Sequence, residues 1–350
     1  MKSYAVVAWG APLEEHDSAT PVPQGAEVLV RVERCGICHS DVHIRHGAFD
    51  LGQGRSSRIE DLGVQLPFTM GHEIVGTVAA LGPDARGVAV GQPVVVYPWI
   101  GCGACDACAA GRDIDCAKNV SLGVRRAGGY ADHVLVPRDR YLLDYGSIDP
   151  NVAATCACSG LTAYSALKKL PPLTATDTIL IIGAGGLGLA ATAIASAVTP
   201  ARIAVADIDE TKLAAAREAG AALTFLSARD DAKRALRAEL GGPVRGVIDF
   251  VGSPATVRLA LDIAAMGATI VVVGLFGGSI DLPTALLPLR NLSLRGSYTG
   301  TLDEMKELLA IVGARGTHAV PITTRPMREV NAALDDLEAG RIVGRVVATV

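Results

Sequence analysis

Between residues 178 and 297 the sequence alternates short apolar segments with alanine-rich segments, and this alternation limits the fold more than any other feature. The strand candidates are Thr178–Ile182, Ile203–Asp207, Leu223–Leu226, Val247–Phe250, Ala268–Val273 and Leu292–Ser297. Helix signals are strongest at Glu210–Ala219, which Asp209 can cap and Gly220 can end, and at Ala255–Ala265. Six strands with intervening helices predict an α/β domain built on a doubly wound parallel sheet.

The turn after the first predicted strand has the pattern Gly-x-Gly-x-x-Gly. It consists of Gly183, Gly185 and Gly188, with Gly186 and Leu187 inside the pattern. Glycine-rich turns are common, but this one joins a strand to a helix, where the backbone can approach a pyrophosphate at the helix N-terminus. Asp207 ends the next strand, and its carboxylate can hold both hydroxyls of an adenosine ribose and would repel a 2′-phosphate. The pattern therefore predicts a dinucleotide site that favours NAD over NADP.

The rest of the chain has a different pattern of apolar and turn-forming residues. Short β-branched runs before residue 153, such as Val28–Val32, Ile74–Ala80 and Pro93–Tyr97, alternate with Gly and Pro turn signals and predict a mostly antiparallel, partly barrel-like domain. After residue 297, two helical patterns (Leu302–Val312 and Arg328–Ala339) and a strand at Arg345–Val350 are too little to fold alone. With 350 residues, two domains are expected. We predict one from residues 1–152 and 298–350, and one from residues 153–297.

Composition excludes several classes of partner. The formal charge is -4, and residues of both signs are interspersed, so there is no concentrated positive field for nucleic acid or anionic lipid. The uncharged segment Thr178–Val198 is long enough to cross a bilayer, but its glycines and the flanking pattern favour a buried parallel strand and its helix. We expect no nucleic acid and no membrane as partners. Because the first ten residues lack a signal-peptide pattern, we expect a cytoplasmic protein.

Four of the eight cysteines share one loop. They are Cys102, Cys105, Cys108 and Cys116. Four thiolates so close together can enclose one tetrahedral zinc with no open position, which is typical of a structural site. An iron–sulfur cluster is the alternative, because thiolates also suit iron. The spacing differs from typical cluster motifs, and Ala117 rather than proline follows the last cysteine, so we favour zinc.

The other metal-ligand candidates are dispersed along the chain. They are Cys35 and Cys38, then His72 and Glu73, and then Cys156 and Cys158. A lone cysteine is usually a small buried apolar residue, and a lone histidine on an apolar face is usually satisfied within the core. Cys35 and Cys38 could also form a redox pair, although no thioredoxin-like strand–helix unit surrounds them.

In their order and spacing, these motifs closely resemble the zinc-containing medium-chain alcohol dehydrogenase family along essentially the whole chain. The resemblance implies a GroES-like catalytic domain, a Rossmann domain, and reversible oxidation of primary or secondary alcohols to aldehydes or ketones with NAD. It further implies that Cys38, His72 and Cys158 hold a catalytic zinc, with Glu73 close enough to enter its coordination sphere. Cys158 is preferred to Cys156 because it precedes Thr162 by the family's usual interval. Each chain would then hold one catalytic and one structural zinc.

The expected chemistry agrees with this set of residues. Zinc bound by two thiolates and one imidazole keeps a fourth position for an alcohol and lowers its pKa toward neutrality. The proton must leave a pocket closed to water: Ser40 can accept it and pass it through the cofactor ribose to His43, whose ordinary pKa of about 6.5 suits exchange with solvent. Asp41 is expected to orient a ligand imidazole.

Further site residues come from the same resemblance. His39 and Arg345 would contact the cofactor pyrophosphate, and Lys212 would add a second ribose contact. An ordinary surface lysine and a surface strand residue are the alternatives for Lys212 and Arg345. Phe49 and Trp99 are the aromatic candidates for the substrate pocket, with core packing as the alternative for each.

Substrate and assembly are less defined by the sequence. The polar segment Leu51–Leu66 is the least regular stretch, and we expect it to cover the entrance or to contact a neighbouring subunit. A homodimer or homotetramer is expected, because sheets in the family commonly join across subunits. A zinc polyol dehydrogenase and a catalytically silent NAD-binding relative are the alternatives. Cys158 argues against the first, where the third ligand is more often Glu, and the intact ligand and relay residues argue against the second.

Overall fold

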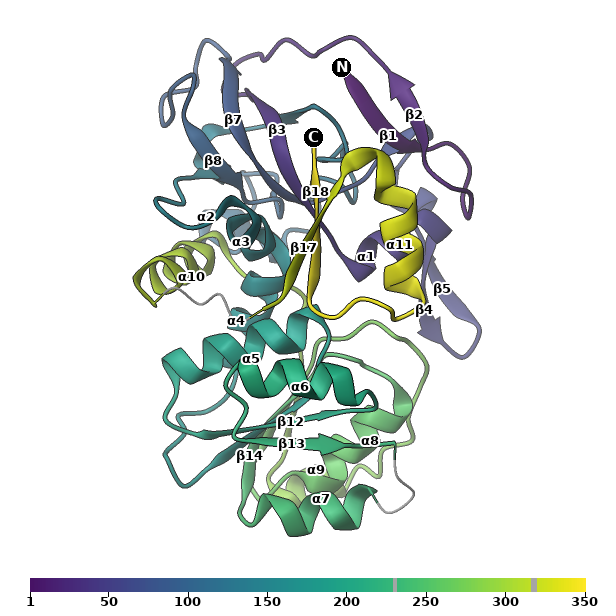
Figure 1. Ribbon diagram of the computed structural model, residues 1–350, viewed down its shortest axis with the longest axis vertical. Coiled ribbons are helices and arrows are strands. Elements are labelled where there is room, and N and C mark those ends of the chain that lie inside the picture. The colour runs from purple at the N-terminus through teal and green to yellow at the C-terminus, as the bar shows by residue number, and fades with distance from the viewer. Residues whose placement is uncertain (229–231, 316–319) are drawn as a thin grey trace.

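The computed structural model describes residues 1–228, 232–315 and 320–350. Figure 1 shows a β-rich part, which contains both termini, above a parallel sheet covered by helices. The β-rich part contains β1 (Lys2–Val6), β2 (Glu14–Asp17), β3 (Val28–Ile37), α1 (His39–His46), β4 (Ala48–Gly52), β5 (Arg55–Arg58), η1 (Glu60–Leu62), β6 (Phe68–Thr69), β7 (Glu73–Leu81), β8 (Pro93–Val96), α2 (Asp106–Ala109), η2 (Asp113–Asp115), β9 (His133–Val136), η3 (Asp139–Tyr141), β10 (Leu142–Leu143) and α3 (Pro150–Thr155).

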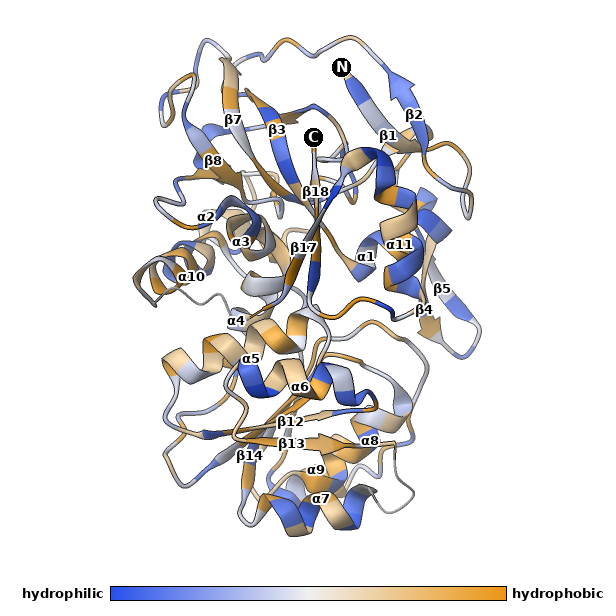
Figure 2. Cartoon of the chain, in the orientation of Figure 1, coloured by the Kyte–Doolittle hydropathy of each residue, from blue (hydrophilic) through white to orange (hydrophobic). Residues whose placement is uncertain are grey.

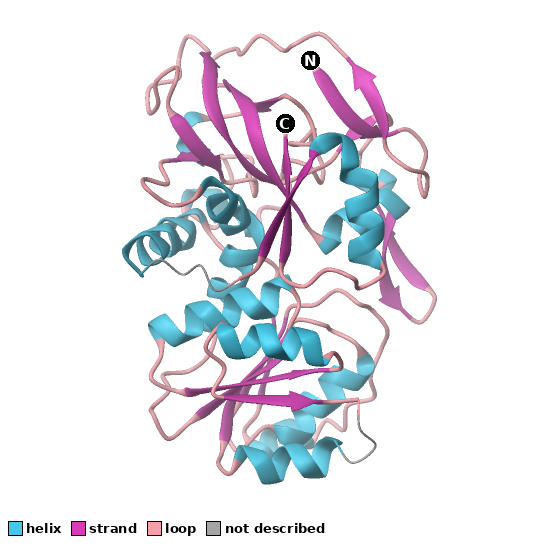
Figure 3. Ribbon diagram, viewed as in Figure 1, coloured by secondary structure: helices cyan, strands magenta, loops and turns pink. Residues whose placement is uncertain are grey.

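The remaining elements follow in chain order. They are the π-helical turn η4 (Cys156–Gly160), α4 (Leu161–Lys168), β11 (Thr178–Ile182), α5 (Gly186–Val198), β12 (Arg202–Asp207), α6 (Glu210–Glu218), β13 (Leu223–Leu226), α7 (Ala232–Leu240), β14 (Val244–Asp249), α8 (Pro254–Ile263), β15 (Thr269–Val272), α9 (Leu286–Arg290), β16 (Ser293–Gly296), α10 (Leu302–Arg315), β17 (Ile322–Pro326), η5 (Met327–Glu329), α11 (Val330–Glu338) and β18 (Arg345–Thr349). Figure 3 shows how helices and strands are distributed between the two parts.

The predicted doubly wound sheet is confirmed. Its strand order is β13-β12-β11-β14-β15-β16, and all neighbouring strands are parallel. The ends of the strands shift little from the prediction, most at β14, which begins at Val244 rather than Val247. The order reverses at β11, and the crevice outside the carboxyl ends of the strands at such a point is where open α/β sheets bind ligands.

Both faces of this sheet are buried, which explains the uninterrupted apolar strands. Ile179 and Ile181 pack into the large core that also holds the β-rich part, whereas Leu180 and Ile182 pack into a second core on the opposite face. Figure 2 shows mostly hydrophobic residues on these strands, and both hydrophobic and hydrophilic residues on α6 and α7. Alternate side chains of one strand therefore serve two cores, as expected for a parallel sheet covered on both sides.

The β-rich part is mostly antiparallel, as predicted. Its main sheet has the order β10-β8-β7-β3-β18-β17, with β9 also paired to β3. The C-terminal strand β18 lies antiparallel to β3, with Val346 opposite Ile37, so the end of the chain returns to the first part. We did not predict β17, which lies parallel to β18. The boundaries at residues 152/153 and 297/298 stay predictions.

The prediction of an irregular loop at Leu51–Leu66 is wrong. This segment completes a two-stranded hairpin of β4 and β5 and continues into η1. Gln53 and Gly54 both have positive φ at the hairpin tip, as a tight two-residue turn requires. Polar side chains on β5 hide the alternation that would identify a strand, since this ribbon has no buried face of its own.

Helices α4 and α5 lie where the two parts meet (Figure 1). The chain passes from α3 through η4 into α4, and α10 packs beside α4. A separate contact joins α1 to α11, where Arg45 forms ion pairs with Asp335 and Glu338 at 2.7 and 2.6 Å. Among the helices in the described ranges, none has the length and apolar character needed to span a membrane.

Candidate active site

The pairing of β3 with β7 brings two dispersed motifs together. Gly36 of β3 lies opposite Glu73 of β7, so Cys38, which caps the start of α1, lies close to His72. The Asp41 carboxylate accepts a hydrogen bond from the Cys38 backbone N–H at 2.9 Å. A hydrogen bond of 2.7 Å from the Tyr130 hydroxyl holds the same carboxylate oxygen. The register of β3 against β7 and the hydrogen bond at the start of α1 therefore determine how Cys38 and His72 lie relative to each other.

Cys38, His72 and Cys158 lie close together beside the start of α1. Their ligand atoms all lie within 4.8 Å of one another, and all three residues are buried. The Sγ atoms of Cys38 and Cys158 are 4.0 Å apart, and this contact holds the pKa of the Cys38 thiol well below its usual range. His72 Nδ1 lies 3.2 Å from Asp41 Oδ1, although the two atoms are not aligned as a hydrogen bond.

The chemistry of this donor set fits zinc. The Nε2 atom of His72 is buried and has no hydrogen-bond partner among the described residues. Buried polar atoms are rarely left without partners, and here the free nitrogen faces two thiols. Two thiolates and one imidazole are a common protein donor set for zinc with one position left open.

Cys35 and Cys156 do not join this group. Both are buried free thiols, and burial raises the pKa of Cys156 to about 12. Cys156 instead borders an apolar cavity with Val152, Ala190 and Leu308. Cys156 and Cys158 are two residues apart in the π-helical turn η4, and only Cys158 joins the donor group.

Glu73 connects the triad to the glycine-rich turn. Its Oε2 atom forms an ion pair with Arg345 Nη2 at 2.5 Å, and its Oε1 atom accepts the Ser159 N–H at 3.1 Å. Burial raises the pKa of Glu73, and the Arg345 guanidinium opposes this rise. Arg345 also lies against Gly186, where an added Cβ would be 2.4 Å from Arg345 Cδ. Arg345 is thus a buried residue and not a surface residue of the strand.

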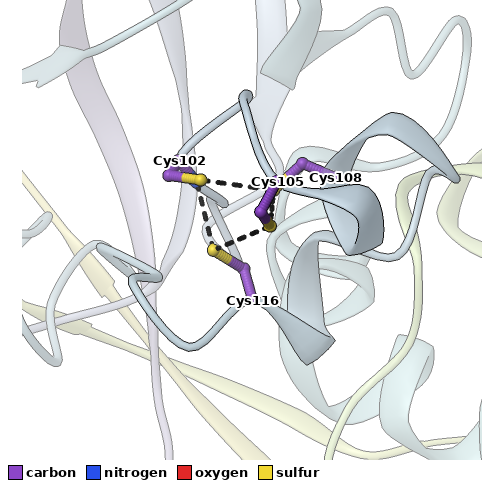
Figure 4. Close-up of side chains that lie close together, drawn as sticks. All are labelled: Cys102, Cys105, Cys108 and Cys116. Atoms are coloured by element: carbon purple, nitrogen blue, oxygen red, sulfur yellow. Dashed lines mark hydrogen bonds between the residues drawn. The ribbon is translucent and has the colours of Figure 1, made fainter.

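The four-cysteine loop forms a second donor cluster (Figure 4). Sulfur–sulfur distances are 3.6 Å for Cys105–Cys108, 3.8 Å for Cys105–Cys116 and 4.0 Å for Cys102–Cys108. A tetrahedral zinc with Zn–S bonds of about 2.3 Å holds its sulfurs roughly 3.8 Å apart. The cluster therefore fits a single ion, whereas a cluster in which each thiolate binds its own iron needs wider separations.

The proposed relay residues lie on α1, directly after Cys38. His39 is exposed, whereas Ser40 and His43 are half-buried. The His43 ring lies 5.3 Å from His39 and 5.1 Å from Phe49, measured between ring centroids. Burial lowers the pKa of His43, and the neighbouring His39 lowers it further. His43 is therefore a neutral base at neutral pH.

The glycine-rich turn is packed at one point and open at another. A Cβ on Gly188 would lie 1.8 Å from the Gly183 carbonyl oxygen, whereas a Cβ on Gly185 would meet nothing within 4 Å. Asp207 Oδ2 accepts the Ala184 N–H at 2.6 Å, so this carboxylate lies against the turn. Leu187 is the second residue of α5, beside the turn, and Lys212 is a half-buried residue of α6.

Trp99 forms one wall beside the triad. Its ring lies 5.5 Å from His72, and its indole N–H donates to the Ala157 carbonyl at 3.1 Å, next to Cys158. Tyr298, which we did not identify from the sequence, packs edge-on against Trp99 with ring centroids 5.5 Å apart. Its position just beyond the carboxyl end of β16 was a signal that could have identified it.

The β4–β5 hairpin reaches across to the parallel sheet. Gly52, at the end of β4, lies against Gly278 in the segment after β15, and a Cβ on Gly52 would be 2.4 Å from the Gly278 carbonyl oxygen. Gly277 lies beside Asp50 in the same way. Because β4 also carries Phe49, which packs on His43, this contact brings the segment after β15 close to the proposed relay.

Comparisons with known proteins match the chain in two regions. Residues 24–144 match the alcohol dehydrogenase GroES-like domain, and residues 186–314 match the zinc-binding dehydrogenase family. An NAD-dependent alcohol dehydrogenase of Sulfurisphaera tokodaii is 36% identical over 349 residues, covering 99% of both chains. Another, of Saccharolobus solfataricus, is 35% identical over 350 residues, again covering 99% of both.

Solved structures agree with these relatives. The alcohol dehydrogenase of Aeropyrum pernix superposes with a TM-score of 0.88 at 30% identity, covering 100% of both chains. An acetophenone reductase of Geotrichum candidum, solved in complex with NAD, gives a TM-score of 0.86 at 29% identity, covering 100% of this chain and 97% of that one. The similarity therefore extends over both the β-rich part and the parallel sheet.

Replacing Gly52 by Ala should separate the hairpin from the segment after β15. Ala at a positive φ costs about 1–2 kcal/mol, and here its Cβ would also collide with the Gly278 backbone. Gly54 is the matched control, because its φ of +73° resembles the +79° of Gly52 and its Cβ would meet open space.

Hydrogen–deuterium exchange can test this difference. We expect G52A to increase exchange both in the hairpin and around residues 275–278, and G54A to increase it only in the hairpin. Equal exchange around residues 275–278 in the two variants would show that the glycine contact does not hold the two parts together.

Proposed function

The chain belongs to the zinc-dependent medium-chain alcohol dehydrogenase family, and we propose that Cys38, His72 and Cys158 bind the metal at which it oxidises primary or secondary alcohols to aldehydes or ketones. The protein is an NAD-dependent oxidoreductase. The observation that carries the assignment of the site is the buried group of two thiols and an unpaired imidazole nitrogen.

Each cofactor has a defined part in this reaction. When bound, zinc would supply a Lewis acid that lowers the pKa of the alcohol hydroxyl, and NAD⁺ would serve as the hydride acceptor, so that each alcohol would yield a carbonyl compound, NADH and a proton. Cys102, Cys105, Cys108 and Cys116 would hold a second zinc that stabilises their loop. Sulfur–sulfur distances of 3.6 to 4.0 Å support a single tetrahedral ion there.

The remaining proton has a path along α1. Ser40 would accept it at Oγ from the alcohol, and His43 would release it to solvent. The lowered pKa of His43 supports this role, because the imidazole is neutral and able to accept a proton at neutral pH. Asp41 would orient the His72 ring, as their 3.2 Å contact suggests.

The crevice at the carboxyl ends of the strands would hold NAD. The backbone of Gly183, Gly185, Gly186, Leu187 and Gly188 would face the pyrophosphate, with His39 and Arg345 as further pyrophosphate contacts. Asp207 and Lys212 would hold the adenosine ribose. The open space beside Gly185 and the position of Asp207 against the turn support this arrangement.

Glu73 would act as a movable carboxylate. It lies directly after His72, and its ion pair with Arg345 keeps it beside the donor group. Phe49 and Trp99 would line the alcohol pocket, supported by the contacts of their rings with His43 and His72.

We also propose a homodimer or homotetramer. Within the described ranges, β16 pairs on one side only, which leaves a free sheet edge. Leu289 and Phe276, both largely exposed, lie in the segments before this strand and support an interface there. Cytoplasmic residence stays a prediction from the sequence.

Replacing Cys158 by Ala should abolish activity while leaving the second metal in place. We expect the zinc content to fall from about two to about one per chain, and kcat/KM to fall by more than about 10³-fold because the Lewis acid is lost. Cys156→Ala is the matched control and should retain both metals and activity. Loss of both metals in C158A, or equal losses in the two variants, would contradict the assignment.

Replacing His43 by Gln should slow alcohol oxidation by about 10²-fold at neutral pH, since the base that releases the proton is removed. The difference in rate between H43Q and wild type should decrease at alkaline pH, where solvent can accept the proton.

Because the pKa of His43 is lowered, the wild-type rate should decline only below the ordinary histidine pKa of about 6.5. A pH profile of kcat/KM tests this, with His46→Gln as a control on the same helix. An unchanged profile in H43Q would exclude His43 from the relay.

Replacing Gly185 by Ala should weaken NAD binding without disturbing the fold. The added methyl group meets open space in the protein but would occupy the side from which the pyrophosphate approaches, so we expect Kd for NAD to rise at least about tenfold. Gly188→Ala should instead destabilise the chain, because its Cβ would collide with the Gly183 backbone. Calorimetric NAD titration and thermal unfolding distinguish the two effects. Unchanged NAD affinity in G185A would place the pyrophosphate elsewhere.

A further inference from the structure

We propose that Asp249 is a positioning residue for the cofactor, and that its side chain holds the turn after β14 in the shape that receives the nicotinamide half of NAD. The proposal rests on the proposed function, because it takes the dinucleotide to lie across the carboxyl ends of the parallel strands. It adds to that function a residue that acts on NAD binding only through the backbone that it holds.

The order of the strands places the nicotinamide half of NAD over β14. In the sheet, β12 and β14 lie on opposite sides of β11. Asp207, the proposed ribose ligand, ends β12, and the glycine-rich turn follows β11. A dinucleotide lies across the point where the strand order reverses, so the half beyond the pyrophosphate extends away from β12 and over β14. Tyr298, which follows β16 and packs on Trp99, lies on the same side of β11.

Asp249 holds the backbone after two neighbouring strands. It is the last residue of β14, and its side chain is fully buried. Its Oδ1 atom accepts the N–H groups of Val251 and Gly252 at 2.9 and 3.0 Å. Its backbone carbonyl accepts the N–H groups of Val273 and Gly274, directly after β15, at 2.9 and 3.1 Å. The conformation of both turns therefore depends on this one residue.

The turn after β14 is packed against the glycine-rich turn. A Cβ on Gly183 would lie 2.8 Å from a methyl carbon of Val251. Gly252 has a φ of +72° and lies on the segment after β15, since its Cβ would be 2.0 Å from the Gly274 carbonyl oxygen. A turn that is packed on two sides cannot shift without a collision or a lost contact. Loss of the Asp249 side chain would therefore change the surface that the turn presents beside the glycine-rich turn.

The second oxygen of this carboxylate contributes nothing to the fold. Asp249 Oδ2 is buried and has no hydrogen-bond partner among the described residues. The hydroxyl of Thr256, in the first turn of α8, donates to the Ser253 carbonyl at 3.0 Å. A buried polar atom without a partner is rare and costs stability. Such departures from good packing are typical of functional sites.

Asp177 offers a matched control at the opposite edge of the same sheet. It directly precedes β11, and its side chain is also buried. Its Oδ2 atom accepts both the N–H group and the hydroxyl of Thr174 at 2.8 Å, so it too holds a turn. Loss of either side chain should lower the stability of the sheet, but only Asp249 lies at the carboxyl ends of the strands.

NADH and ADP separate the two halves of the cofactor. ADP contains the adenosine and the pyrophosphate but lacks the nicotinamide half. Calorimetric titrations of the zinc-loaded protein should compare wild type, Asp249→Ala, Asp249→Asn and Asp177→Ala. We expect D249A to raise Kd for NADH at least about tenfold and Kd for ADP by no more than about threefold. D177A should leave both values within about twofold of wild type.

The asparagine variant tests how Asp249 acts. D249N keeps one carbonyl oxygen that can accept the Val251 and Gly252 N–H groups, so its Kd for NADH should stay within about threefold of wild type. In steady-state measurements, D249A should raise KM for NAD⁺ by a larger factor than it lowers kcat, as expected for a residue that acts through cofactor binding.

Three results would overturn the proposal: unchanged NADH affinity in D249A, equal increases of Kd for NADH and ADP in D249A, or the same increase for NADH in D177A. If D249A does not fold, Val251→Ala replaces it, because this change removes the methyl groups beside Gly183 and leaves the carboxylate in place. The ratio of Kd for NADH to Kd for ADP should then rise at least about threefold, and an unchanged ratio would overturn the proposal.

The binding measurements do not depend on the alcohol reaction. If wild type oxidises no alcohol, the proposed function fails, whereas the NADH and ADP titrations still decide the role of Asp249. If wild type oxidises alcohols and D249A binds NADH as wild type does, only the role of Asp249 is excluded.

Discussion

The buried ion pair between Glu73 and Arg345 joins the parts of the molecule on which activity depends. Glu73 begins β7 next to His72, and Arg345 begins β18 and lies against Gly186 of the glycine-rich turn. Either charge alone in this interior would be strongly destabilising, because a buried ion needs a partner to offset its lost hydration. The C-terminal strand therefore has to return to β3, and in doing so it links the metal donors to the dinucleotide turn.

Two glycines allow the close approach on which this arrangement depends. A Cβ on Gly36 would lie 1.8 Å from Glu73 Oε2, and one on Gly71 would lie 2.5 Å from the Tyr130 ring. These glycines bring the Glu73 carboxylate up to β3, and the His72 segment up to the Tyr130 ring, more closely than any side chain would permit.

Prediction from the sequence succeeded where a local pattern is directly coupled to structure. The six apolar strands, the glycine-rich turn and the four-cysteine loop each depend on short-range spacing, and each is present. It failed at β4–β5, where a polar ribbon lacks the alternation caused by a buried face, and at β17, which exists because it pairs with β18. It also missed Tyr298, which reaches Trp99 only after β16 has folded into the sheet.

The sequence by itself determined the class of chemistry and the kind of fold, because metal donors, glycines and apolar periodicity are properties of residue type and spacing. Tertiary structure decided which of these residues meet. The register of β3 against β7 brings Cys38 to His72, and the packing of η4 brings Cys158 rather than Cys156 to them. The return of β18 gives Arg345 a buried carboxylate as its partner. Such contacts join residues far apart in the chain, and their geometry depends on packing that no local segment of sequence contains.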